Sequence, residues 1–395
     1  MRQIKKIALM AVGDSAWQGG IQYITNIIHA LNSLGDELKL EVHLFKRESQ
    51  LFQEIDNFRN IKLEVHSIEK VIPPFSLINR LLWFAQRKLF GRINPRFENY
   101  FLKNSFDYVF PATLSTCGGE LNSGSWIADF QYHHFPTGHN NQTTRDAAKT
   151  ISLIARQTAK IILSSRFCEK DCLELFPVSR GKVHVMPFSV YINKEHLANE
   201  GLDLIRKKYG IEGPYVMVSN LFASTKNHKT LFEALAILRT RGIPMNCVCT
   251  GNFVNATKIE FTNEILQIIT DTGVRDQLLI LGLIPREHQV ALYRMAMAMV
   301  QPSLHEGWST CVEEARALGK VLVLSDIEVH REQDPDNPYF FHGMDPVDLS
   351  HKLEAVLVLQ HDKVFPDVQA EIAAREKYKL SIEAFGENFL RIASI

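Results

Sequence analysis

The sequence lacks an excess of charge of either sign, because its 395 residues include 44 lysines and arginines and 44 aspartates and glutamates. A dedicated nucleic-acid-binding protein usually carries a basic excess, so the balance argues against nucleic acid as a partner. Long apolar runs are also missing, and none approaches the roughly 20 residues that span a bilayer. The length exceeds that of one ordinary hydrophobic core and predicts two domains.

Cysteine is scarce, with six residues in the chain. Cys168 and Cys172 are four positions apart, and Cys247 and Cys249 are two apart. Neither pair has the C-x-x-C spacing that is typical of zinc sites. We interpret the cysteines as reduced thiols, which is their usual state in the cytosol, and we expect a cytoplasmic protein.

Two nucleotide-binding motifs are absent from the sequence. It has no G-x-x-x-x-G-K-[ST], and no G-x-G-x-x-G follows its first apolar run. That run, Ile7–Val12, comes after basic residues, as in a signal peptide. However, it is short, and Gly13-Asp14 ends it without a clear small-residue cleavage site. We therefore predict a first buried strand.

Strand and helix patterns alternate along the whole chain. The expected strands are residues 5–13, 40–45, 106–112, 123–130, 159–165 and 182–190 in the first half, and 215–221, 245–252, 278–284, 297–303 and 321–326 in the second. Apolar residues at helical spacing predict helices at 19–35, 229–242, 259–273 and 287–296. Such alternation indicates parallel sheets covered by helices on both faces. We interpret the polar, lysine-rich residues 193–213 as the crossing between two Rossmann-like domains.

The stretch HEGWSTCVEEARALGK holds two glutamates near a predicted helix start. Glu306 lies in the loop after an apolar strand pattern, and Glu314 lies within the first turns of the helix. Ligands of open α/β sheets bind at this end of the strands, and the backbone N–H groups near Thr310 and Cys311 can hold an anion. The carboxylates would then accept hydrogen bonds from neutral hydroxyls. A sugar nucleotide has this layout.

A purely structural role is the alternative for these glutamates, because a glutamate near a helix start is commonly a cap or complements the helix dipole. Thr310, followed three residues later by Glu313, fits a capping box, and we assign that role to Glu313. Gly319 is expected to end the helix as its left-handed cap. For Glu306 and Glu314, each taken alone, both interpretations stay open.

The same stretch resembles the E-x7-E signature of retaining glycosyltransferases with the GT-B fold, family 4 in the sequence classification. Gly19-Gly20 is similar to the glycine-rich first loop of that family, and WIADFQYHHFP, VSNLFASTKNHKTLFEAL, LGLIPREH and SDIEVHREQ are similar to its later segments in the same order. The resemblance covers most of the chain. It implies an α/β protein of the GT-B class, with two Rossmann-like domains whose parallel sheets face a central cleft.

The resemblance also implies a domain organisation and an activity. We expect an N-terminal acceptor domain at residues 1–192, with a C-terminal helix at 376–395 packing back on it, and a donor-binding domain at 193–375. The activity would be transfer of a sugar, with retention of configuration, from a nucleotide sugar to a hydroxyl of a glycan or lipid-linked acceptor. The implied setting is bacterial surface polysaccharide synthesis. No cofactor is expected, and no metal ion.

Catalytic roles follow from the resemblance for matching positions around the sugar. Glu306 would contact the hydroxyls of the donor sugar, helped by the backbone of Gly307 and Trp308. Lys226 would neutralise the leaving phosphate. His134 would sit over the reacting sugar from the N-terminal domain.

The nucleotide end of the donor has its own implied partners. Thr310 and Cys311 would offer backbone N–H groups to the diphosphate, and Glu314 would hold the ribose. Gly19 and Gly20 would let the backbone approach the donor closely, as glycine permits.

One position departs from the family pattern. The family usually has an arginine six residues before the phosphate lysine, where this chain has Asn220. One of two cations at the leaving group is therefore missing, and Lys229 is a candidate to compensate. Two alternatives stay open: a sugar-nucleotide epimerase on the same fold, which would need no acceptor, and a non-catalytic subunit that binds a sugar nucleotide, which this departure motivates.

Two short patterns resemble metal sites. His133, His134 and His139 fall within seven residues, but no cysteine or carboxylate with ligand spacing accompanies them. The acidic pair in DPD at residues 334–336 mimics the D-x-D metal motif of the other glycosyltransferase fold. Its surroundings are rich in proline, and we interpret it as a turn.

A basic amphipathic segment, Leu77–Lys103, stands out in this neutral protein. It carries six basic residues against the single acid Glu98, interleaved with tryptophan, phenylalanine and leucine. Such a segment suits an anionic membrane surface. We expect peripheral docking on the inner face of a membrane, with an ordinary domain helix as the alternative.

Overall fold

The computed structural model describes residues 5–14, 18–53, 55, 58–71, 95–113, 120–135, 141–253 and 259–394. The chain divides into two compact units, Met1–Tyr191 with Leu380–Ile395, and Ile192–Lys379. The predicted domain boundaries lie between residues 192 and 193 and between residues 375 and 376, whereas the two units divide between residues 191 and 192 and between residues 379 and 380. The long helix α15 (Val368–Ser394) begins in the second unit and ends in the first.

Every strand pair of the first unit is parallel. One sheet has the order β3-β2-β1-β4 and a second the order β5-β6-β7, and a single parallel bridge between Val109 and Ser123 joins β4 to β5. This is the Rossmann order, with the first strand at the point where the order reverses. The strands are β1 (Lys6–Met10), β2 (Leu40–Lys46), β3 (Ile61–Ser67), β4 (Tyr108–Phe110), β5 (Gly124–Ile127), β6 (Lys160–Leu163) and β7 (Val183–Val185).

The spacing of apolar residues determines which face of a helix packs on the sheet of the first unit. In α1 (Gln18–Ser33), Ile24, Ile27, Ile28 and Leu31 share one face and are fully buried. Because α1 begins at Gln18, Gly19 and Gly20 lie in its first turn rather than in the predicted loop. The other helices are α2 (Ile68–Val71), α4 (Pro95–Lys103), α5 (Gln131–His134), α6 (Asn141–Gln157) and α7 (Arg166–Leu175), with short 3-10 turns at Asp36–Leu38 and Pro177–Ser179.

The second unit holds one six-stranded parallel sheet of order β10-β9-β8-β11-β12-β13. Its strands are β8 (Tyr215–Ser219), β9 (Asn246–Thr250), β10 (Leu278–Gly282), β11 (Ala298–Gln301), β12 (Val321–Ser325) and β13 (Tyr339–Phe341). Its helices are α8 (Leu202–Lys208), α9 (His228–Thr240), α10 (Ile259–Thr272), α11 (Arg286–Met295), α12 (Thr310–Ala317), α13 (Glu328–Glu332) and α14 (Pro346–Gln360). Short 3-10 turns occur at Lys194–Leu197, Ser224–Lys226 and Arg275–Gln277. The strand order again reverses next to the first strand, here between β8 and β11.

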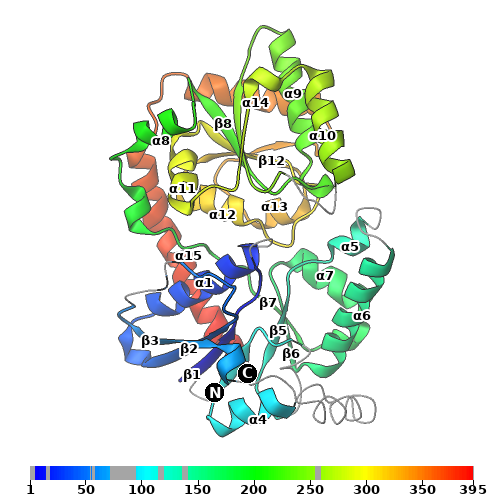
Figure 1. The fold of residues 1–395 in the computed structure, drawn as a ribbon, viewed down its shortest axis with the longest axis vertical. Coiled ribbons are helices and arrows are strands. Elements are labelled where there is room, and N and C mark those ends of the chain that lie inside the picture. The colour runs from blue at the N-terminus through cyan, green and yellow to red at the C-terminus, as the bar shows by residue number, and fades with distance from the viewer. Residues whose placement is uncertain are drawn as a thin grey trace. The chain divides into compact units, whose positions relative to one another are not determined.

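Two apolar layers cover the sheet of the second unit. Helices α9, α10 and α14 pack on one face through residues such as Leu231, Ile265 and Leu353. Helices α8, α11 and α12 pack on the other face (Figure 1) through residues such as Leu202 and Val312. The sheet is therefore buried on both sides, as the continuous apolar runs of its strands predict.

Several local predictions are wrong. Residues 193–213 are not a plain crossing, because α8 lies there and Leu202 and Ile211 belong to the core of the second unit. The strands β3 and β13 were not predicted.

Most of the basic segment, residues 77–94, lies outside the described residues, and its remaining part falls in α4 and belongs to the first unit. Across the described parts of the chain, no helix is both long and apolar enough to cross a bilayer.

The ends of α12 differ from the predicted capping box. Ser309, not Thr310, is the N-cap. Glu313 is buried and accepts hydrogen bonds from Tyr378 at 2.6 Å and Gln333 at 2.8 Å. Glu313 thus anchors the helix to its neighbours instead of capping it. The predicted left-handed cap is confirmed, because Gly319 has φ +62°.

We expect Gly319→Ala to lower the free energy of unfolding more than Gly242→Ala does. Both glycines follow helix C-caps with positive φ, +62° and +74°, so each alanine is strained by about 1–2 kcal/mol. A Cβ at Gly319 would also lie 2.6 Å from the backbone oxygen of Ala370, whereas nothing lies within 4 Å at Gly242. Chemical denaturation of both variants measures the difference, and equal losses would contradict the steric clash.

Candidate functional site

The candidate site lies at the carboxyl ends of β8 and β11, where the strand order of the second unit reverses. Asn220 directly follows β8, and Gln301 is the last residue of β11. The Asn220 side chain donates from Nδ2 to Gln301 Oε1 at 2.6 Å. Asn220, at the position where the resemblance leads us to expect arginine, therefore contacts a buried glutamine that the sequence does not single out.

The loops that follow these two strands bring Lys226 to Glu306. Lys226 Nζ lies 2.5 Å from Glu306 Oε1, with the side chains 19% and 9% exposed. Gln301 Nε2 donates to the same carboxylate oxygen at 2.9 Å. The backbone N–H of Leu304 donates to Thr225 O at 2.8 Å and ties the two loops together. Two predicted catalytic residues thus share one hydrogen-bonded cluster.

The charge of Glu306 is set by two opposing effects. Burial raises its pKa, but the charge of Lys226 and its hydrogen bond lower it, and the net pKa is below the usual value. Glu306 is therefore ionised at neutral pH. An ionised carboxylate is an acceptor only, so it can receive hydrogen bonds from hydroxyl groups.

Glu314 forms a second buried ion pair, with Arg286. Arg286 Nη1 lies 2.6 Å from Glu314 Oε1, with the side chains 15% and 4% exposed. Arg286 is the first residue of α11, in the helix that follows β10. In the sequence this arginine lies in LGLIPREH, a segment that resembles the family without indicating a role for it. The available signal was its place at the start of a helix, just beyond the carboxyl end of a strand.

Lys229, the candidate to replace the missing family arginine, points to a different partner. Its Nζ lies 3.9 Å from Glu233 on the same helix α9, and its side chain is 58% exposed. Arg286, in contrast, is mostly buried beside a predicted donor-binding carboxylate. Among the described residues, Arg286 is thus the better candidate for the second cation.

The first turn of α12 faces the same cluster. Its N-cap residue Ser309 accepts at Oγ from Gln301 Nε2 at 3.0 Å, and its backbone oxygen accepts from Gln333 at 3.0 Å. The Ser309 side chain is thus turned toward Gln301 rather than toward the first-turn N–H groups of Thr310 and Cys311. Such N–H groups have no acceptor within the helix, and they carry the positive end of its dipole.

The neighbouring side chains hold this turn in place. Cys311 Sγ donates to Ser219 O at 2.7 Å, so the start of α12 is attached to the end of β8. Burial raises the pKa of the Cys311 thiol to about 12, with Glu314 adding to the effect, and the thiol stays a protonated donor. Gly307 is buried and Trp308 half-buried in the loop before the helix.

The remaining predicted residues belong to the first unit. His134, at the end of α5, places Nε2 2.7 Å from Asp171 Oδ2, and Asp171 is nearly buried on α7. The ring of Phe167 packs against His134, with ring centres 5.4 Å apart. Asp171 was not predicted. The sequence pattern of His133, His134 and His139 resembles a metal site. The structure does not describe this group as a whole, because His139 lies outside the described residues.

The DPD sequence at residues 334–336 lies in a turn, as predicted. Asp334 and Asn337 have positive φ angles of 44° and 46°. Asp336 pairs with Lys377 at 2.6 Å, and both side chains are largely exposed. The two aspartates therefore belong to a solvated surface turn.

The arrangement in the second unit offers three kinds of group side by side. Two carboxylates, Glu306 and Glu314, can accept hydrogen bonds from hydroxyls. Two cations, Lys226 and Arg286, lie within ion-pair distance of them and can bind phosphate oxygens. The first turn of α12 adds backbone donors for an anion. Together these groups can bind a molecule that contains both sugar hydroxyls and a diphosphate.

Comparison with known proteins finds similarity to one family model and to curated relatives. Residues 203–365 match the family model described as glycosyl transferases group 1. Curated relatives include EpsF of Bacillus subtilis, 27% identical over 151 residues, which make up 38% of this chain and 37% of EpsF. Mannosylfructose-phosphate synthase of Agrobacterium fabrum is 21% identical over 177 residues, 44% of this chain and 39% of that protein. The chain thus matches less than two fifths of the length of either relative.

Solved structures share the architecture over the full chain. The crystal structure of Anabaena HepE in complex with UDP and glucose is similar with a TM-score of 0.65, at 15% identity, over 98% of this chain and 99% of that chain. At this identity the likeness concerns the fold. It confirms the predicted α/β fold class, GT-B with two Rossmann-like halves.

Proposed function

We propose, on the premise that residues 203–365 form a group 1 glycosyl transferase domain in a chain with the GT-B fold, that this protein is a retaining glycosyltransferase. It would move a sugar from a nucleotide sugar to a hydroxyl of a glycan or a lipid-linked acceptor. The observation that carries the proposal is the pair of buried ion pairs, Lys226–Glu306 and Arg286–Glu314, beside the start of α12.

The proposed chemistry is stabilisation of the departing diphosphate. As the bond between the sugar and the phosphate oxygen breaks, negative charge grows on that oxygen. Lys226, Arg286 and the first-turn N–H groups of Thr310 and Cys311 would stabilise this charge. Donors that are already fixed in place need little reorganisation during the reaction, and such electrostatic stabilisation is commonly the largest catalytic contribution.

The two carboxylates would contact different parts of the donor. Glu306 would accept from hydroxyls of the transferred sugar, next to Lys226 at the leaving group. Glu314 would accept from the ribose, held in place by Arg286. The acceptor hydroxyl would attack from the face that the diphosphate leaves, which retains the configuration. The role of His134 over the sugar stays a prediction from the family resemblance.

A turnover assay separates this proposal from its alternatives. The protein is incubated with UDP-, GDP- and other nucleotide sugars, with and without acceptor extracts, and the release of nucleoside diphosphate is measured. Release that depends on acceptor supports transfer. An epimerised donor without acceptor would indicate an epimerase, and binding without any turnover would indicate a non-catalytic subunit.

The proposed setting is the cytoplasmic face of a bacterial membrane, in surface polysaccharide synthesis. The support is the family resemblance and the basic composition of Leu77–Lys103. Co-sedimentation with anionic and neutral vesicles tests the docking. Binding to anionic vesicles that fades with salt, and that falls in an Arg87→Glu/Lys88→Glu variant, would support it. Equal and negligible binding to both would refute it.

We expect Asp171→Asn to lower turnover by roughly tenfold, a loss of about 1.4 kcal/mol in transition-state stabilisation, with little change in KM for the donor. The reason is the 2.7 Å contact that fixes the His134 ring. Glu169→Gln is the matched control, because Glu169 lies on the same helix and pairs only distantly, at 4.0 Å, with Arg166. Steady-state kinetics measure both. Unchanged turnover in Asp171→Asn would exclude a positioning role.

A further inference from the structure

A second cluster of polar side chains lies on the sheet of the first unit. His43 is on β2, and Glu64 and His66 are on β3, the edge strand. In the parallel register His43 is directly opposite Glu64. Side chains two residues apart on a strand share a face, so His66 points to the same side as Glu64. Three potential metal ligands are therefore gathered on one face.

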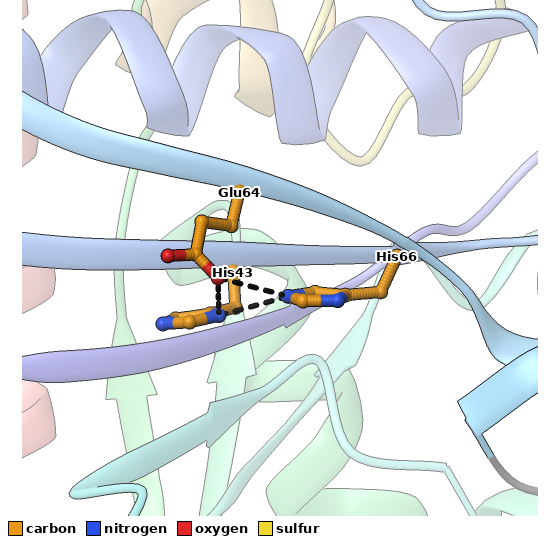
Figure 2. A group of neighbouring side chains, drawn as sticks. All are labelled: His43, Glu64 and His66. Atoms are coloured by element: carbon orange, nitrogen blue, oxygen red, sulfur yellow. Dashed lines mark hydrogen bonds and ion pairs between the residues drawn. The ribbon is translucent and has the colours of Figure 1, made fainter.

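The three ligand atoms form a compact triangle (Figure 2). His43 Nδ1 lies 2.9 Å from His66 Nε2 and 3.5 Å from Glu64 Oε2, and His66 Nε2 lies 3.7 Å from the same oxygen. In a tetrahedral zinc site with bonds of about 2.0–2.1 Å, neighbouring ligand atoms stand roughly 3.3–3.4 Å apart. The triangle thus has nearly the required size, and the two nitrogens need to separate by only about 0.4 Å.

The surrounding groups leave these ligand atoms available. Lys62 Nζ forms an ion pair with the other oxygen of Glu64, Oε1, at 2.7 Å. The oxygen Oε2 is therefore the one that faces the histidines. Glu41 Oε2 lies 3.7 Å from the second nitrogen of His43, Nε2. The usual outer partner of a metal-binding histidine is a carboxylate that accepts a hydrogen bond from its far nitrogen; Glu41 lies near that position without making the hydrogen bond.

The cluster is also reachable from solvent. The side chains of Glu64 and His66 are 38% and 24% exposed, whereas that of His43 is 7% exposed. The buried His43 would hold the ion at a fixed position, and the partly exposed Glu64 and His66 would let it enter from solvent. Among the described residues, this is the single group of three or more histidine, cysteine or acidic side chains with metal-site spacing.

We propose that His43, Glu64 and His66 bind a divalent transition-metal ion of the zinc class in the first unit. The nitrogen–nitrogen contact at 2.9 Å is an N–H···N hydrogen bond without metal. On binding, the ion takes the place of that hydrogen atom; the ring that loses this proton takes one up from solvent on its other nitrogen, so both imidazoles stay neutral and no net proton is released. Three protein ligands leave a fourth position for water. The ion would cross-link the edge strand β3 to β2.

Cobalt is the spectroscopic probe for this site. Full-length protein is treated with a chelator and titrated with Co²⁺, and then with Zn²⁺ in competition. We expect one equivalent of cobalt to bind with the visible absorption of a tetrahedral site, and zinc to displace it. Zinc should also raise the Tm of the full chain. Wild-type protein that takes up no cobalt or zinc would overturn the proposal.

Matched variants assign the binding to this cluster. His66→Gln and Glu64→Gln should each weaken cobalt binding at least tenfold, because each removes one ligand. Both positions are partly exposed, so we expect the variants to fold. His361→Gln is the control, since His361 is exposed and lies 2.8 Å from a single carboxylate, Asp362. Retained affinity in His66→Gln, or an equal loss in His361→Gln, would refute the site. Circular dichroism confirms that each variant is folded.

Discussion

Replacing Lys226 with alanine is expected to reduce donor turnover by roughly tenfold to a hundredfold. The lysine makes a charge-assisted contact that is worth about 1.5–3 kcal/mol, and in the proposed reaction that contact passes to the leaving phosphate. Release of nucleoside diphosphate from the donor measures the effect. Lys229→Ala is the matched control, because Lys229 is three residues further on and is largely exposed. An equal loss in both variants would exclude a specific role for Lys226.

The same variant should reverse the sign of the contribution that Glu306 makes to the pH dependence of stability. In the wild type the pKa of Glu306 is lowered, so the ion pair stabilises the fold above the ordinary glutamate pKa, and this contribution is lost as the pH falls through the lowered value. Without Lys226, burial dominates and raises the pKa of Glu306. The variant should then lose stability as the pH rises through that higher value. Urea denaturation of both proteins between acid and neutral pH measures the effect as the difference between their free energies of unfolding at each pH.

Glu306→Gln and Glu314→Ala are expected to damage different steps. Glutamine at position 306 keeps the size but removes the charge beside the reacting sugar, so kcat should fall by roughly a hundredfold or more, with a small change in KM. Alanine at position 314 removes the proposed ribose contact, so KM for the donor should rise by at least roughly tenfold. Steady-state kinetics with varied donor concentration separate the two effects.

The control for the second variant is Glu354→Ala. Glu354 pairs with Arg241 at 2.6 Å, the same distance as the pair of Glu314 with Arg286, but its side chain is 31% exposed. Its loss should leave both kinetic constants unchanged. Parental kinetics in folded Glu306→Gln and Glu314→Ala would show that these glutamates have structural roles alone.

The fold was predictable where the strands are buried on both faces. The apolar runs that became β8, β11 and β12 are unbroken and separated by amphipathic helices, so both their type and their parallel pairing follow from the sequence. The strand β3 was missed for the opposite physical reason. It lies at a sheet edge, and Lys62, Glu64 and His66 make one of its faces polar, so its apolar signal is weak.

Residues of the candidate site were predictable where a local sequence motif indicates their chemistry. Glu306, Glu314 and Lys226 are predicted from such motifs, and the structure places all three in one unit with their charges paired; their roles stay predictions. Arg286 and Gln301 were not identified. Each reaches the site from a different strand end, and only the strand order brings those ends together. Two hydrogen-bond partners of Glu313, Tyr378 and Gln333, are 65 and 20 residues away in the chain, so a local capping rule predicts the wrong role for that glutamate.

The most direct test of the central claim is calorimetric titration of the full-length protein with a panel of nucleotide sugars that begins with UDP-glucose. The account predicts that at least one binds with one molecule per chain and is displaced by its free nucleoside diphosphate. At a hundredfold excess over Kd it should raise the free energy of unfolding by about 2.7 kcal/mol. Binding should weaken in Glu314→Ala and persist in Glu354→Ala. Failure of every nucleotide sugar to bind, or equal binding in both variants, would contradict it.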